Sequence, residues 1–203
     1  MAGALLERYG VVSREAALAE DLPGGFGPVY RVLKAMEDAG RIRRGWFVEG
    51  LSGAQFALPG ALDRLRARRR EPGEPGEPGV VLLPATDPAN AWGALLPWPE
   101  SPDGAPRPRR VPGAWVCLVD GRLAWYVPPA RRQLLLFPGP AGGEREALRA
   151  ALQALHRLPR RGRRMLSLDS INGVPAAESP FLEAFGEAGF VRDYRSLIAD
   201  PAR

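Results

Sequence analysis

Cationic side chains gather between residues 30 and 44, and their spacing would suit phosphate binding. A guanidinium or ammonium group forms charge-assisted hydrogen bonds with phosphate oxygens, and each phosphate neutralised in this way releases counterions. A phenol hydroxyl in the same stretch adds a further donor to a sugar-phosphate backbone. The alternative is a scaffold that packs on neighbouring modules and whose charges are only solvated. The pattern favours nucleic-acid binding through Tyr30, Arg31, Lys34, Arg41, Arg43 and Arg44.

A second basic cluster joins a predicted helix to a predicted strand and consists of Arg160, Arg161, Arg163 and Arg164. Another run, 66–70, ends a predicted helix beside an acidic stretch. Both clusters allow two interpretations, a grip on a nucleic-acid backbone or a solvated surface. The net charge of +5 does not decide between them, because 27 of the 28 basic residues are Arg, as a GC-rich genome would produce. The excess of basic over acidic side chains lies mainly in residues 1–70, which hold 12 basic and 8 acidic side chains.

Three carboxylates could do acid-base or electrostatic work: Asp87, Asp169 and Asp200. Asp87 lies in ATDPANAWG beside Asn90 and Trp92, so a carboxylate, an amide and an indole could converge there. Asp169 lies in LSLDSING at a strand end. The alternative for both motifs is a turn whose own side chains satisfy its backbone. With one Cys and one His, the usual zinc sites are excluded. We expect Cys117 to be a buried thiol and His156 to be solvated.

Residues 1–70 read as a winged helix that positions the first cationic group. Short helices are predicted over 2–9 and, after the cap Ser13, over 14–20. A third helix has Pro28 in its first turn and ends at Gly40, and a basic strand, a Gly-containing turn and a second strand follow. Its predicted inner stripe is Val29, Val32, Leu33 and Met36, which leaves Tyr30, Arg31, Lys34 and Asp38 outside. Trp46 and Phe47 are expected to pack in the core and wing, the alternative being that they serve as base-stacking platforms.

The remaining chain is expected to form a small antiparallel β-barrel or sheet over 80–140 and an α/β unit over 141–203 that packs on it. Three Glu-Pro-Gly repeats over 71–79 predict a mobile linker before them. Asp120-Gly121 between two apolar runs predicts a type I′ hairpin. The predicted fold class is α+β.

Four phrases resemble one family over nearly the whole chain: RRGWFVEGLSGAQFALPGALDRLR, ATDPANAWGALLPWP, GAWVCLVDGRLAWYV and LSLDSINGVPAAESPFLEAFGEAGFVRDYRSL. They are similar to the extreme C-terminal region of the Lhr, or large helicase-related, proteins of helicase superfamily 2. The resemblance implies a non-catalytic DNA-binding and assembly module of an ATP-dependent DNA helicase involved in DNA repair. Separately, no apolar run of the sequence approaches the length needed to cross a bilayer, so we expect a cytoplasmic location with no membrane partner.

The resemblance further implies partners and cofactors. We expect DNA, either single-stranded or at a duplex junction, the rest of the helicase polypeptide, and a possible second copy of the chain. No P-loop is present, because the only lysine, Lys34, lies in RVLKAM. We therefore expect no cofactor in this chain, with ATP and Mg²⁺ bound by motor domains that it lacks.

A second function stays open, that of a DNA glycosylase acting on a flipped base through an aspartate. The predicted arrangement also resembles the AlkZ-type winged-helix glycosylases. The Gln-x-Gln signature of that family is absent, because Gln55, Gln133 and Gln153 are isolated. Such an enzyme would have to use Asp87, Asp169 or Asp200.

Overall fold

The structure is a computed structural model of residues 1–203, and it describes all of them except 69–76, 103, 138–143, 160–164 and 200–203. The Arg160 to Arg164 cluster, Asp200 and most of the predicted linker lie outside the described residues. The chain divides into two compact units. The first comprises Met1–Glu74 with Ala94–Pro97, and the second comprises Pro75–Gly93 with Trp98–Arg203.

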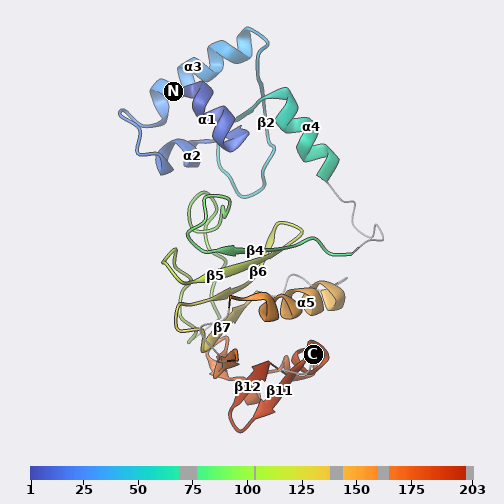
Figure 1. The fold of residues 1–203 in the computed structure, drawn as a ribbon. Coiled ribbons are helices and arrows are strands. Elements are labelled where there is room, and N and C mark those ends of the chain that lie inside the picture. The colour runs from blue at the N-terminus through green and yellow to red at the C-terminus, as the bar shows by residue number, and fades with distance from the viewer. Residues whose placement is uncertain (69–76, 103, 138–143, 160–164, 200–203) are drawn as a thin grey trace. The chain divides into compact units, whose positions relative to one another are not determined.

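The first unit is a winged helix, as the sequence predicted (Figure 1). Its three strands form an antiparallel sheet in the order β1-β3-β2, with β2 at an edge. The Ser13 side chain caps α2 by accepting a hydrogen bond from the Ala16 N–H at 3.3 Å. The elements are α1 (Ala2–Tyr9), β1 (Val11–Val12), α2 (Arg14–Ala19), α3 (Phe26–Asp38), β2 (Arg43–Gly45), β3 (Gln55–Ala57) and α4 (Pro59–Arg68).

The buried stripe of α3 differs from the predicted one. Val29 and Leu33 are buried, but Val32 is 51% exposed. The ring of Tyr30 instead packs edge-on against Phe26 and Phe56, with ring centroids 5.7 Å apart in each pair. Because α3 already begins at Phe26, its apolar spacing is i, i+3, i+4, i+7, which includes position 30 rather than 32. The prediction that Tyr30 lies on the outer face is therefore wrong.

The second unit is built on an open six-stranded sheet in the order β10-β9-β7-β6-β5-β4. All neighbours are antiparallel except β7 and β9, which pair in parallel. Asp120 and Gly121 both have positive φ angles, 48° and 81°, which confirms the hairpin turn between β5 and β6. The strands of this sheet are β4 (Val80–Pro84), β5 (Trp115–Val119), β6 (Arg122–Val127), β7 (Gln133–Leu136), β9 (Ser170–Ile171) and β10 (Val174–Pro175).

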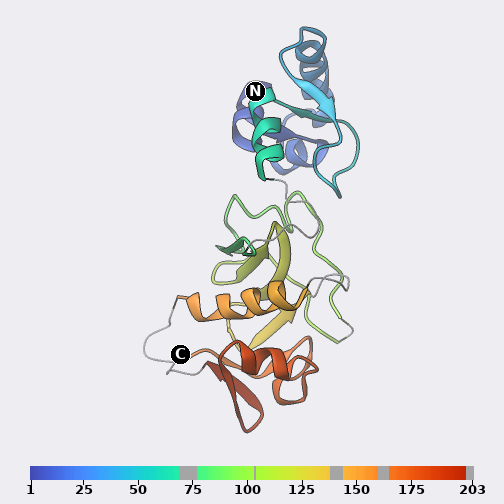
Figure 2. The same ribbon diagram turned by 90° about the vertical axis from the view of Figure 1, so that its right-hand side faces the viewer.

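Of the two expected forms, a barrel or a sheet, the structure has the sheet, and the barrel is wrong: the sheet stays open and is covered on both faces. One face packs against helix α5 (Glu144–Gln153), which is anchored where the Trp125 indole N–H donates to the Ala151 carbonyl at 2.6 Å (Figure 2). The other face holds a separate buried cluster with Val116, Tyr126 and Leu135, packed by side chains from the loop between β4 and β5. Once both apolar faces are covered, closure is not needed to bury them.

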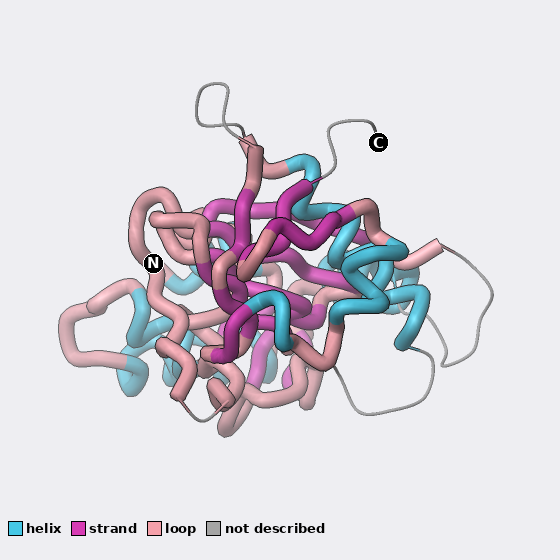
Figure 3. Tube along the Cα trace, turned by 90° about the horizontal axis from the view of Figure 1, so that it is seen from below, coloured by secondary structure: helices cyan, strands magenta, loops and turns pink. Residues whose placement is uncertain are grey.

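The C-terminal part adds a second sheet in the order β11-β12-β8, of which Figure 1 labels β11 and β12. Figure 3 shows the strands of the chain in magenta and its helices in cyan. The strand predicted after the second basic cluster is split between two sheets, and a further strand over Ser196–Ala199 was not predicted. Phe185, Phe190 and Leu197 join the same buried cluster as the α5 face of the large sheet. The elements are the 3₁₀ turns η1 (Ala154–Arg157) and η2 (Ala176–Glu178), strands β8 (Ser167–Leu168), β11 (Phe190–Asp193) and β12 (Ser196–Ala199), and helix α6 (Leu182–Glu187).

Candidate nucleic-acid interface

The outward face of α3 carries two cations. Arg31 and Lys34 are exposed and lie three residues apart, with Ala35 and Asp38 completing the spacing of one helical face. Within the described part of the chain, neither Arg31 nor Lys34 forms an ion pair. Their charges are therefore free to meet an external anion.

The turn after α3 and strand β2 supply three more of the predicted cations. Arg41 and Arg43 are exposed and, among the residues that the structure describes, have no acidic partner. Arg44 differs, because its Nε lies 3.2 Å from the Glu37 carboxylate of α3. Its side chain remains 45% exposed, so the pair ties β2 to α3 without hiding the guanidinium.

The wing between β2 and β3 is held by one buried amide. Gln55 is fully buried, and its side-chain oxygen accepts hydrogen bonds from the N–H groups of Phe47, at 2.9 Å, and Val48, at 2.8 Å. Its amide nitrogen donates to the carbonyls of Val48, at 2.9 Å, and Leu51, at 3.3 Å. One side chain thus satisfies four backbone groups of a loop, groups that are not paired with a neighbouring strand.

A carboxylate from α2 holds the far side of the same wing. Glu15 accepts hydrogen bonds from the Ser52 hydroxyl at 2.5 Å and the Ser52 N–H at 3.2 Å. Burial alone would raise the pKa of Glu15, but the hydrogen bonds, led by that of the Ser52 hydroxyl, lower it below its ordinary value. Glu15 is therefore ionised at neutral pH and clamps the wing as an acceptor.

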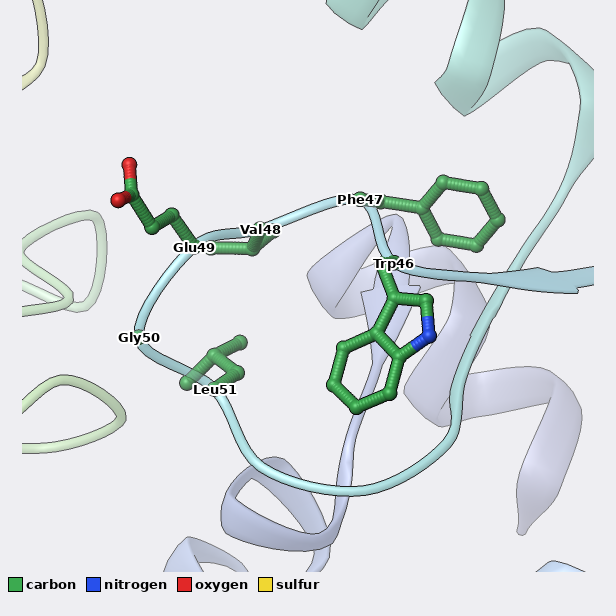
Figure 4. Close-up of a pocket in the computed structure, with 6 residues that line it drawn as sticks. All are labelled: Trp46, Phe47, Val48, Glu49, Gly50 and Leu51. Atoms are coloured by element: carbon green, nitrogen blue, oxygen red, sulfur yellow. The ribbon is translucent and has the colours of Figure 1, made fainter.

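Trp46 opens the wing and is 79% exposed, so the expectation that it packs internally is wrong. Phe47 behaves as predicted, since it is half-buried and its ring fills the space above Gly45, where a Cβ would approach it to 2.8 Å. The two side chains point in different directions from the chain (Figure 4). A hollow of about 480 Å³ is lined by Trp46, Phe47, Val48, Glu49, Gly50 and Leu51.

The Asp87 loop is a self-satisfied turn. The Asp87 carboxylate accepts from the Ala89 N–H at 2.8 Å, and Asn90 is buried with its amide bonded to Ala85 and Trp92 backbone groups. The Arg110 guanidinium donates to four carbonyls of this loop, including that of Asn90 at 2.6 Å. Sequence reasoning missed Arg110, which lies 23 positions from Asp87. No base and nucleophile converge here among the described residues.

Asp169 is also engaged. Both of its carboxylate oxygens bind the Arg132 guanidinium, the second contact measuring 2.8 Å, and Ser196 donates to it at 3.0 Å. Asn172, at φ 51°, exchanges hydrogen bonds with the Leu136 backbone on β7. These contacts join β7, the β8–β9 segment and β12. They run to distant residues and not to the backbone of their own turn, so the expectation of a self-satisfied turn is wrong for Asp169 and Asn172.

The two remaining candidates, Cys117 and His156, are both in contact with other parts of the fold. Cys117 is fully buried, as predicted, and burial raises its pKa to about 12. His156 is not simply solvated, because its Nε2 lies 2.8 Å from the Ala188 carbonyl and its ring is 4.7 Å from that of Phe190. Among the described residues, no cluster of three His, Cys, Asp or Glu side chains is arranged to hold a metal ion.

Comparison with known proteins places the winged helix in a defined class. Residues 1–77 match the family of winged-helix domains described as large helicase-related protein, winged-helix domain. Over 192 residues, 93% of the chain, the sequence is 47% identical to a protein of Mycolicibacterium smegmatis named Lhr helicase/probable uracil glycosylase. Over 189 residues, 92% of the chain, it is 40% identical to the Lhr helicase/uracil glycosylase of Escherichia coli.

These matches confirm the predicted family, that of the Lhr helicases, and are consistent with the C-terminal region of such a protein. The chain spans about 12% of the length of each relative. The described helices include none long and apolar enough to cross a bilayer.

Proposed function

We propose that this chain is a non-catalytic DNA-binding and assembly module of an Lhr-type helicase, and that its winged helix contacts DNA phosphates. The observation that supports it most is the set of exposed cations without an acidic partner on α3, the turn after it and β2: Arg31, Lys34, Arg41 and Arg43. They belong to a fold that presents a helix and a wing to a duplex. The Lhr match covers the same residues.

The proposed contacts are mainly electrostatic. Phosphate contacts give affinity and register but carry no sequence information, so binding should vary little with base sequence. Arg44 contributes less than its neighbours, because Glu37 already neutralises part of its charge. ATP and Mg²⁺ would act in the motor domains of the parent polypeptide. The proposed partners of this chain are that polypeptide, DNA and a second copy of the chain.

A charge-matched pair of variants tests the proposal. Replacing Arg31, Lys34, Arg41 and Arg43 with Ala should weaken binding to a fluorescent duplex at fixed salt by at least tenfold, whatever its sequence. The control removes four exposed arginines of the second unit: Arg107, Arg109, Arg122 and Arg149. Equal losses in the two variants would point to a general charge effect. No loss in the first would remove the winged helix as the binding surface.

A second candidate, a DNA glycosylase, is favoured by the names of both relatives, which include uracil glycosylase. Of the described candidates, Asp87 is the more available, since only its Oδ1 is bonded and the Asp169 carboxylate is held by Arg132. The assay is release of abasic product from uracil-containing strands. Activity that Asp87→Asn, Asp169→Asn or Asp200→Asn abolishes in a folded protein would identify the aspartate. Product formation untouched by all three would contradict an Asp mechanism.

A further inference from the structure

We infer that Trp46 stacks on an unpaired base, so that the winged helix prefers DNA with a duplex to single-strand boundary over blunt duplex. This inference rests on the proposed function and adds the residue that would contact an unpaired base. It rests on the juxtaposition of an exposed indole, an ordered wing and neighbouring cations.

The exposure of Trp46 is the first step. At 79% it is the most exposed of the large apolar side chains in the first unit, whereas Trp125 of the second unit is fully buried. A tryptophan left in water forgoes one of the largest gains available from burial. Among the described residues, the indole contributes to no buried cluster. An external flat apolar surface would compensate for this exposure.

The wing is ordered around Trp46. The next residue, Phe47, is fixed through its ring over Gly45 and through its N–H, which donates to Gln55. Gln55 also holds Val48 and Leu51, and Glu15 holds Ser52. An aromatic side chain with only two rotatable bonds, mounted on a fixed backbone, loses little entropy when a ligand stacks on it.

The surroundings favour a nucleic acid over a protein segment. Arg44 lies two residues before Trp46, roughly 7 Å along an extended chain, and Arg41 and Arg43 lie just beyond. Glu49 is the single acidic residue lining the hollow beside the indole. Cations next to an exposed aromatic ring are the combination that binds single strands.

Stacking needs a base whose face is free. In a blunt duplex only the two terminal pairs offer one, whereas a single-stranded arm offers many. Base-aromatic stacking changes affinity by roughly 5- to 150-fold per base, and it tolerates any sequence. Trp46 should therefore add affinity for forked and single-stranded DNA, and little for the duplex alone.

The test uses the full chain and three labelled DNAs: a fork, the matching blunt duplex and its single strand. Trp46→Ala should weaken fork and single-strand binding about 5- to 150-fold and duplex binding less than twofold. Trp46→Phe, which keeps an aromatic face, should recover most of the loss. The matched control is Tyr194→Ala, which removes an aromatic ring that is 80% exposed in the second unit.

The part of the tryptophan fluorescence that is lost in Trp46→Phe belongs to Trp46. In the wild-type chain this part should be quenched when the fork binds and not when the duplex binds. Equal weakening of all three DNAs by Trp46→Ala, or no weakening of any, would overturn the inference, the second outcome leaving a protein partner for the indole. The proposed function fails separately, when the wild-type chain binds none of the three DNAs or when removal of the four cations leaves its affinity unchanged.

Discussion

One polar and one aromatic residue of the wing show how single positions determine the candidate interface. Gln55 is buried and Trp46 is exposed, the reverse of what their side-chain polarities suggest. The amide is buried because loop carbonyls and N–H groups need partners inside the fold, and it satisfies four of them. The indole was expected inside because hydrophobicity favours burial. Neither position follows from local pattern alone, since both depend on where the wing folds.

Gln55→Ala should destabilise the first unit by about 1–3 kcal/mol, because it leaves buried backbone groups of the wing unpaired. The measurement is the free energy of unfolding from urea denaturation. Gln133→Ala, at an exposed glutamine, is the control and should stay within about 0.5 kcal/mol of the wild type. Equal stability of both variants would show that the Gln55 bonds are dispensable.

Cys117 should resist thiol reagents in the native protein at pH 8, because burial raises its pKa to about 12 and leaves almost no thiolate. One thiol per chain should react after denaturation. Labelling with a chromogenic disulfide, followed by the absorbance of the released thiolate, measures both states. Rapid stoichiometric labelling of the native chain would contradict the burial of β5.

At the scale of elements, the sequence predicted the winged helix because its signals are local. A serine cap, a proline in a first turn and a glycine stop each act within a few residues. The buried stripe of α3 differs from the predicted one because the helix begins at Phe26. Pairing between distant strands could not be predicted, as with the parallel contact of β7 and β9, whose partners Gln133 and Ser170 are 37 positions apart. Strand alternation also does not say whether a sheet closes.

The corrected stripe of α3 makes a matched prediction. Leu33→Ala should cost about 2–5 kcal/mol in unfolding free energy, since the leucine is fully buried. Val32→Ala, one position away and 51% exposed, should change stability by no more than about 0.5 kcal/mol. Urea denaturation distinguishes the two. A larger loss for Val32→Ala than for Leu33→Ala would restore the originally predicted stripe.

At the scale of the whole molecule, the described core residues fall into separate clusters for the two units. One cluster draws only on residues of the first unit, and the other two draw only on the second. Ala94–Pro97, which is grouped with the first unit, adds no side chain to that unit's buried cluster. Two cores that share no side chains have no obvious reason to unfold together.

Fragments 1–78 and 79–203 should therefore each fold when expressed alone. Each should show one cooperative thermal transition by circular dichroism, and the two transitions should account for the melting curve of the full chain. The intact chain is the control. A fragment that lacks native helix or strand signal at 20 °C would contradict independent folding, and would show that each core depends on the other unit.

The central claim, phosphate contact by the winged helix, is tested most directly by the salt dependence of duplex binding. The logarithm of the association constant should fall linearly with the logarithm of salt concentration, with a slope of about −0.9 per phosphate contacted. Removing Arg31, Lys34, Arg41 and Arg43 should make the slope shallower by up to about 3.6, and removing Arg107, Arg109, Arg122 and Arg149 should leave it unchanged. An unchanged slope in the first variant, with the fold intact, would contradict the account.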